Sequence, residues 1–195
     1  HWQSRGLGDV YKRQYINSDH CPCFTQINVN RISSGQAILK VLIPYMHKVY
    51  NQYRLDIEQS NYLPQFKHLE EFRVKRYLTG GDERFDEHVD VTDTVSSARA
   101  LAFLVYLNEN DGNTLFPSQN LNIEPISGRV IVFPPTWEYP HEGLAPKSNP
   151  KYIMSTYVHY GKNWNYDSSQ SCIWWRILKK SNSIHTTRLL WEQNW

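Results

Sequence analysis

Three residues in the middle of the chain have the types and the spacing of a metal site. His88 and Asp90 are two residues apart, and His141 lies 53 residues after His88, beyond an apolar run that ends at Phe133. We expect His88 and Asp90 at the start of a strand, where residues two apart point to the same side. Two histidines and one carboxylate form the facial triad that holds non-haem Fe(II) and leaves coordination positions open. The pattern therefore predicts a catalytic metal site.

A lysine ten residues after His141 is placed to serve the same site. Lys151 begins an alternating run in which Ile153 and Tyr157 share its face. A cation there could pair with the remote carboxylate of an oxo acid bound to the metal. Lys147 is a rival cation, but it lies in a loop between two prolines, and we rank it below Lys151.

A helical segment is expected before these residues. Ser33 and Gln36 are spaced as a capping box, which predicts a helix start. Pro44 is expected to divide the segment into two helices within about residues 33–58. The apolar positions that follow recur every three to four residues and predict one buried stripe. They are Ile38, Leu42, Met46, Val49, Tyr53 and Ile57.

Short strands are expected to carry the site itself. In the first of them, Arg73 and Lys75 alternate onto the same face as Tyr77, which favours an acidic or peptide-backbone partner, although solvated strand cations are the commoner explanation. Turn residues separate the apolar runs at spacings typical of an antiparallel sandwich or barrel. The runs cover residues 72–78, 100–107, 129–133 and 151–160.

Composition excludes several classes of protein. The chain has 195 residues, of which 40% are hydrophobic and 14% aromatic, so it is not disordered, collagen-like or a coiled coil. The longest apolar run is residues 100–106, far short of the ~20 residues that a membrane span needs. Three cysteines form no disulfide framework, and no signal peptide opens the chain, so we expect a cytoplasmic location.

The two ends differ from the middle of the chain. Residues 1–16 carry a net charge of +2 and residues 162–195 carry +3, which leaves −3 on residues 17–161. An acidic middle argues against nucleic acid as a partner. We expect residues 1–16 to be a non-native or disordered arm. Residues 162–195 are a Trp-rich tail, with five of the seven tryptophans, whose structure the sequence does not predict.

Five motifs between Phe72 and Tyr160 resemble, in order, the catalytic domain of the 2-oxoglutarate and Fe(II)-dependent dioxygenases, in the prolyl 4-hydroxylase-like branch. The motifs are Arg76-Tyr77-Leu78-Thr79-Gly80-Gly81 with Phe85-Asp86-Glu87-His88-Val89-Asp90, residues 99–108, Asp111-Gly112-Asn113-Thr114-Leu115-Phe116-Pro117, residues 125–134, and His141-Glu142-Gly143 with Lys151-Tyr152. The resemblance implies an α+β fold, with N-terminal helices packed on a double-stranded β-helix (jelly-roll) core of about residues 70–161. Residues 17–161 would then be a single domain.

The resemblance also implies the roles of particular residues. His88, Asp90 and His141 match the iron ligands, and Lys151 matches the base that pairs with the C5 carboxylate of 2-oxoglutarate. Three further positions match residues around the cosubstrate: Tyr77, which hydrogen-bonds the same carboxylate, Thr114, and Tyr157, which stands in place of a tryptophan. The implied cofactors are Fe(II), 2-oxoglutarate and O2, with ascorbate as a reductant.

The substrate is the least determined part of this hypothesis. The resemblance favours a prolyl residue of a peptide or protein, hydroxylated with release of succinate and CO2. Two departures bear on the substrate: His88 lies eleven positions after Tyr77, and Asn113 stands where a second glycine is usual. A hydroxylase of a free amino acid or small metabolite, and a non-catalytic jelly-roll binding module, remain open. A nucleic-acid demethylase would carry arginine in place of Lys151 and a basic groove. The sequence does not specify the oligomeric state.

Overall fold

The computed structural model describes residues 11–13 and 24–161, except residue 82. The expected tail lies outside these residues, and so does the expected arm apart from Tyr11–Arg13, which form a strand. The strands are β1 Tyr11–Arg13, β2 Thr25–Asn28, β3 Arg73–Tyr77, β4 Phe85–His88, β5 Arg99–Tyr106, β6 Thr114–Phe116, β7 Leu121–Ile123, β8 Val130–Phe133, β9 His141–Gly143 and β10 Lys151–His159. One α-helix, α1 Gly35–Asp56, and the short 3-10 helices η1 Val29–Arg31, η2 Ser60–Tyr62 and η3 Pro117–Gln119 complete the described elements.

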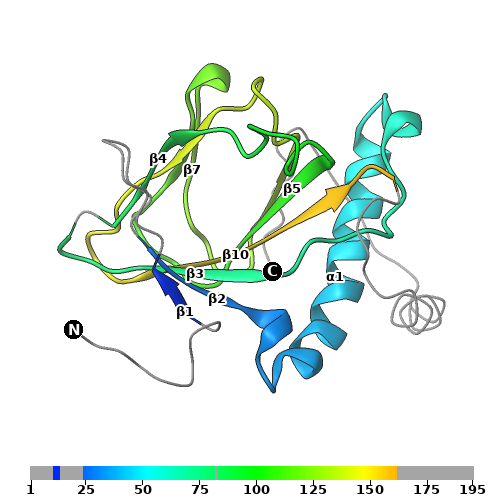
Figure 1. Ribbon diagram of the computed structural model, residues 1–195. Helices are drawn as coiled ribbons and strands as arrows, with labels where there is room; N and C mark the ends of the chain where they lie inside the picture. The colour runs from blue at the N-terminus through cyan, green and yellow to red at the C-terminus, as the bar shows by residue number, and fades with distance from the viewer. Residues whose placement is uncertain (1–10, 14–23, 82, 162–195) are drawn as a thin grey trace.

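The strands form two antiparallel sheets. Six strands lie in the order β1-β2-β3-β10-β5-β8, and four lie in the order β4-β9-β6-β7. Helix α1 lies on one side of the large sheet, and β4 and β7 lie on the other (Figure 1). The mixture of a helix and antiparallel sheets confirms the α+β expectation.

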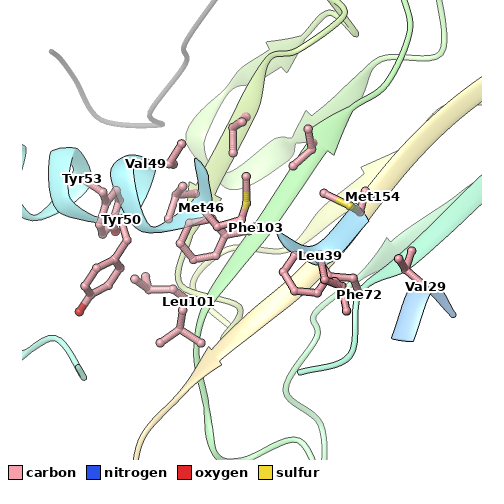
Figure 2. Packing of buried hydrophobic residues seen from close by; sticks show 14 residues of the cluster. Val29, Leu39, Met46, Val49, Tyr50, Tyr53, Phe72, Leu101, Phe103 and Met154 are labelled. Atoms are coloured by element: carbon pink, nitrogen blue, oxygen red, sulfur yellow. The ribbon is translucent and has the colours of Figure 1, made fainter. Parts of the chain in front are cut away.

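Strand β5 is buried on both faces because each face meets a different layer. Leu101, Phe103 and Val105 pack with α1, as Figure 2 shows for the first two. The alternate residues Leu104 and Tyr106 pack between the two sheets with Phe116 and Phe133. This two-sided burial explains why the run at residues 100–107 is continuously apolar rather than alternating.

Helix α1 differs from its prediction in three ways. It is a single helix, because Pro44 lies inside it and does not divide it. Its N-cap is Ser34, which makes no side-chain capping hydrogen bond, so the expected capping box of Ser33 and Gln36 is wrong. The residues buried against the sheet are Leu39, Met46, Val49, Tyr50 and Tyr53, whereas Ile38 is exposed (Figure 2).

Packing on both sides of Pro44 accounts for the unbroken helix. A proline inside a helix removes one backbone hydrogen bond, here to the carbonyl of Lys40. Lys40 is exposed, so water can satisfy that carbonyl. Leu39 before the proline and Met46 after it are both buried in the same cluster, which keeps the two halves of the helix aligned.

No helix among the described residues is long and apolar enough to cross a membrane.

Candidate active site

The two predicted histidines meet because their short strands pair. Strand β4 is antiparallel to β9, and His88 lies directly opposite His141 in the register. Their ring centroids are 4.3 Å apart. His88 is at the end of β4, not at the start of a strand as expected, because the strand already begins where Phe85 pairs with Gly143.

Asp90 lies just beyond β4, where its backbone is held from two directions. Its amide donates to the carbonyl of Pro135 at 3.1 Å, and its own carbonyl accepts from Arg99 Nη1 at 2.7 Å. Asp90 Oδ1 is 3.6 Å from His88 Nε2, and Oδ2 is 3.7 Å from His141 Nε2. One ligand atom from each of the three residues lies within 4.8 Å of the other two, so the group could hold a metal ion.

Backbone carbonyls fix which nitrogen each histidine presents. His88 Nδ1 is 2.8 Å from the carbonyl oxygen of Asp86, and His141 Nδ1 is 3.1 Å from that of Tyr139. A carbonyl only accepts, so both Nδ1 atoms must donate, and both Nε2 atoms keep a lone pair. Those lone pairs face Asp90. This donor set suits a divalent transition metal.

Electrostatics keep His141 and Asp90 in the protonation states that metal ligands need. Burial lowers the pKa of His141 to about 4, so its ring is neutral at pH 7. Burial alone would raise the pKa of Asp90, but the neighbouring His88 and His141 and the charge of Lys75 hold it well below its usual range. Phe85 stacks on the His88 ring, with centroids 3.5 Å apart, which restricts that ring's rotation.

A pocket beside the triad brings all seven predicted site residues together. It is lined by Lys75, Tyr77, Phe85, His88, Asp90, Leu104, Thr114, His141, Gly143, Lys151, Ile153 and Tyr157. Lys151, Ile153 and Tyr157 share one face of β10, as the alternation predicted. Lys147 is exposed and does not line the pocket.

Lys151 is buried among groups that can receive a carboxylate. Its side chain is 1% exposed, and Nζ donates to the carbonyl of Gly112 and lies 5.5 Å from the centre of the Tyr77 ring. Burial and the charge of Lys75 lower the pKa of Lys151 to about 7. Gly143 lies next to this lysine, since a Cβ at this position would be in ordinary van der Waals contact with Lys151 Nζ, at 3.6 Å.

A buried charge network outside the pocket supports Asp90. Arg99 donates to both carboxylate oxygens of Glu70, at 2.6 and 3.0 Å, and His159 Nε2 is 2.7 Å from the same carboxylate. The Arg99 guanidinium also lies 4.0 Å from the centre of the Tyr157 ring. This network was not predicted from the sequence. Its members are 29 and 89 residues apart in sequence, so no local pattern could indicate it.

Comparison with known proteins agrees with this geometry. Residues 72–159 match the family model described as the 2OG-Fe(II) oxygenase superfamily. The match covers less than half of the chain and includes all seven predicted site residues. The matched domain supports an oxygenase that uses Fe(II), 2-oxoglutarate and O2, and the group of His88, Asp90 and His141 could bind the iron. No curated protein matches the chain.

Two solved structures share the fold of this oxygenase. One is the viral collagen prolyl hydroxylase of Paramecium bursaria Chlorella virus-1 with 2OG, at a TM-score of 0.55 and 19% identity over 71% of this chain and 79% of that chain. The other is a prolyl hydroxylase from Trichoplax adhaerens with a peptide fragment of the hypoxia inducible factor oxygen degradation domain. Its TM-score is 0.62, with 17% identity over 86% of this chain and 75% of that chain.

Proposed function

We propose that this oxygenase hydroxylates an unactivated C–H bond of a prolyl residue in a peptide or protein. One oxygen atom of O2 enters the substrate, and the other enters succinate as 2-oxoglutarate loses CO2. The observation that carries the proposal is the pocket itself, which is lined both by a group of two histidines and one carboxylate and by a buried lysine. We further propose a double-stranded β-helix core within a single domain of residues 17–161.

His88, Asp90 and His141 would hold the iron. Bound Fe(II) supplies the activation of O2 that the organic groups of a protein cannot provide. The chain's own part is geometric: the carbonyls behind both imidazoles aim their Nε2 atoms, and Arg99 and Pro135 fix the backbone of Asp90. Three protein ligands leave further coordination positions for the cosubstrate and O2.

Lys151 would bind the C5 carboxylate of 2-oxoglutarate. A buried carboxylate without a charged partner is costly, and the Lys151 ammonium is the matching cation at this end of the pocket. Tyr77 would donate a hydrogen bond from the same side. The Thr114 hydroxyl accepts from Tyr106 Oη at 2.7 Å, which leaves the Thr114 proton free to reach the cosubstrate. Tyr157 would line the wall next to Asp90.

The prolyl substrate is supported by the fold neighbours. Both are prolyl hydroxylases, and the one from Trichoplax adhaerens is complexed with a peptide. Ascorbate would serve as a reductant that keeps the iron in its Fe(II) state.

The test is metal-dependent turnover by the purified protein. Conversion of 2-oxoglutarate to succinate is measured with a panel of proline-containing peptides and free amino acids, each scored for a mass gain of one oxygen atom. We expect turnover with Fe(II) and a mass gain on a peptide proline. Turnover with a free amino acid alone would overturn the peptide assignment, and absence of any Fe(II)-dependent turnover would overturn the function.

Variants of the metal ligands separate the site from the fold. His88→Ala, Asp90→Ala and His141→Ala should each abolish Fe(II) binding and turnover while the far-ultraviolet circular dichroism stays unchanged. Glu87→Gln is the matched control, because Glu87 is exposed on the same strand. Full activity in any of the three ligand variants would contradict the assignment.

A further inference from the structure

A second lysine lies in the same pocket, and the proposed function gives it no role. Lys75 is on β3, two residues before Tyr77 and on the same face. Its side chain lines the pocket with Asp90 and Lys151 and is 9% exposed.

Lys75 has no anionic hydrogen-bonding partner among the residues that the structure describes. Its Nζ lies 5.2 Å from the centre of the Phe24 ring and 5.4 Å from that of Phe85, and within the described ranges it forms no hydrogen bond and no ion pair. Ring faces stabilise a cation only partly. A buried ammonium group is normally paired, because burial of an unpaired charge is costly.

The surrounding charges show which kind of ligand is missing. Burial lowers the pKa of Lys75 to about 8, Asp90 acts in the opposite direction, and the nearby cations Arg73 and Arg99 lower it further. Lys151 lines the same pocket from the neighbouring strand β10. If the carboxylate of Asp90 is bound to iron, as the proposed function requires, the pocket holds two lysines with no counter-charge left for either.

The strand register places these two lysines as a pair. Tyr77 on β3 lies opposite Lys151 on β10, and Lys75 lies opposite Ile153. Lys75 is therefore displaced from Lys151 by one strand and by two residues, about 7 Å along the strand. Lys75 Nζ lies 5.4 Å from the centre of the Phe85 ring, which stacks on the metal-ligand candidate His88, whereas Lys151 Nζ donates to the carbonyl of Gly112. Lys75 is thus the cation at the metal end of the pocket, and Lys151 is the cation at the far end.

2-Oxoglutarate carries one carboxylate at each end of a five-carbon chain. We propose that Lys75 binds its C1 carboxylate, the one beside the keto group, while Lys151 binds the C5 carboxylate. This inference rests on the proposed function. The pocket then holds one lysine for each carboxylate, and the cosubstrate neutralises both buried lysines as it binds.

The test measures binding without turnover. Mn(II) replaces Fe(II), and dissociation constants are determined by isothermal titration calorimetry for two ligands. The first is 2-oxoglutarate. The second is 2-oxopentanoate, which keeps the C1 carboxylate and the keto group but has a methyl group in place of the C5 carboxylate. The variants are Lys75→Met and Lys151→Met, which keep the length of the side chain and remove its charge.

We expect Lys75→Met to weaken the binding of both ligands by the same factor, about 10- to 100-fold, because both carry the C1 carboxylate. Lys151→Met should weaken the binding of 2-oxoglutarate by a similar factor and leave the binding of 2-oxopentanoate unchanged. Arg73→Met is the control, since Arg73 lies on the same strand outside the pocket lining, and it should change neither constant more than twofold.

Other outcomes discriminate between the two proposals. Unchanged binding of 2-oxoglutarate in Lys75→Met would overturn the inference and leave the proposed function intact. Weaker binding of 2-oxoglutarate together with unchanged binding of 2-oxopentanoate in Lys75→Met would also overturn the inference, because Lys75 would then bind the C5 carboxylate. Failure of the unmodified protein to bind 2-oxoglutarate with Mn(II) present would overturn the proposed function itself. If Lys75→Met does not fold, Lys75→Gln takes its place, with the thermal unfolding midpoint measured for each variant.

Discussion

The carboxylate of Glu70 should make a large and pH-dependent contribution to stability. It accepts two hydrogen bonds from Arg99 and lies 2.7 Å from His159 Nε2, and all three side chains are largely buried. The perturbation is Glu70→Gln, which keeps the shape of the side chain and removes its charge.

The expected size follows from the pKa of Glu70. Burial alone would raise this pKa, but the hydrogen bonds from His159 and Arg99 lower it overall from 4.5 to about 2. A group whose pKa is depressed by folding stabilises the protein fully above its unfolded pKa, and this contribution is lost as the pH falls through the folded pKa. The ionised carboxylate should therefore contribute about 3 kcal/mol at pH 7 and about 2 kcal/mol at pH 3.5.

The assay is urea unfolding of the metal-free protein at pH 7, 5 and 3.5, followed by circular dichroism. The free energy of unfolding of Glu70→Gln should lie below that of the unmodified protein by these amounts, and the gap should narrow below pH 4.5. Glu71→Gln is the matched control, because Glu71 pairs with the exposed Arg31 at 3.4 Å. Such a pair is worth less than about 1 kcal/mol.

Two results would refute this reasoning. A gap of equal size at pH 7 and pH 3.5 would mean that the charge of Glu70 is not what stabilises the fold. A loss of unfolding free energy in Glu71→Gln as large as that in Glu70→Gln would mean that the buried network contributes no more stability than a surface ion pair.

Two further predictions concern helix α1 and are checked by urea unfolding. Gly35→Ala should destabilise the protein by about 3 kcal/mol, since the new Cβ would lie 1.7 Å from the carbonyl oxygen of Val29; Gly81→Ala, where a Cβ meets nothing within 4 Å, should be close to neutral. Pro44→Ala should stabilise the protein by about 1 to 2 kcal/mol, because it restores the amide that bonds the carbonyl of Lys40. A destabilised Pro44→Ala would show that the proline ring packs more tightly than its half-burial indicates.

The strands at the site could be predicted because their patterns are local. The alternation from Lys151 to Tyr157 fixes which side chains share a face whatever β10 pairs with, and the structure places Lys151, Ile153 and Tyr157 in one pocket. The spacing of His88 and Asp90 was informative for a different reason than expected. His88 meets His141 through the pairing of β4 with β9, and Asp90 joins them from a bend just beyond β4, not from a strand face shared with His88.

The helix shows where local patterns fail. The predicted stripe included Ile38, but the helix buries Leu39 instead, because the sheet beneath sets the helix rotation. Pro44 is a reliable helix breaker only when nothing holds the two halves together, and the burial of Leu39 and Met46 does so here.

The role of Lys75 depends on tertiary structure in the same way. Its place on the face of Tyr77 was visible in the sequence, but its burial was not. A lysine on an alternating strand is usually solvated. Here Phe24 and Phe85 cover it, and these residues come from segments about 50 and 10 residues away.

The two-sided burial of β5 limits how this oxygenase could be redesigned. Leu104 forms part of the pocket wall, and its neighbours Phe103 and Val105 pack with α1 on the opposite face. A larger side chain on the helix side can therefore displace the backbone of the strand that carries the wall. A substitution at Leu104 that aims to change the substrate range would need side chains of matching volume where Phe103 and Val105 pack against α1. Substitutions in α1 can therefore change the shape of a site that α1 does not line.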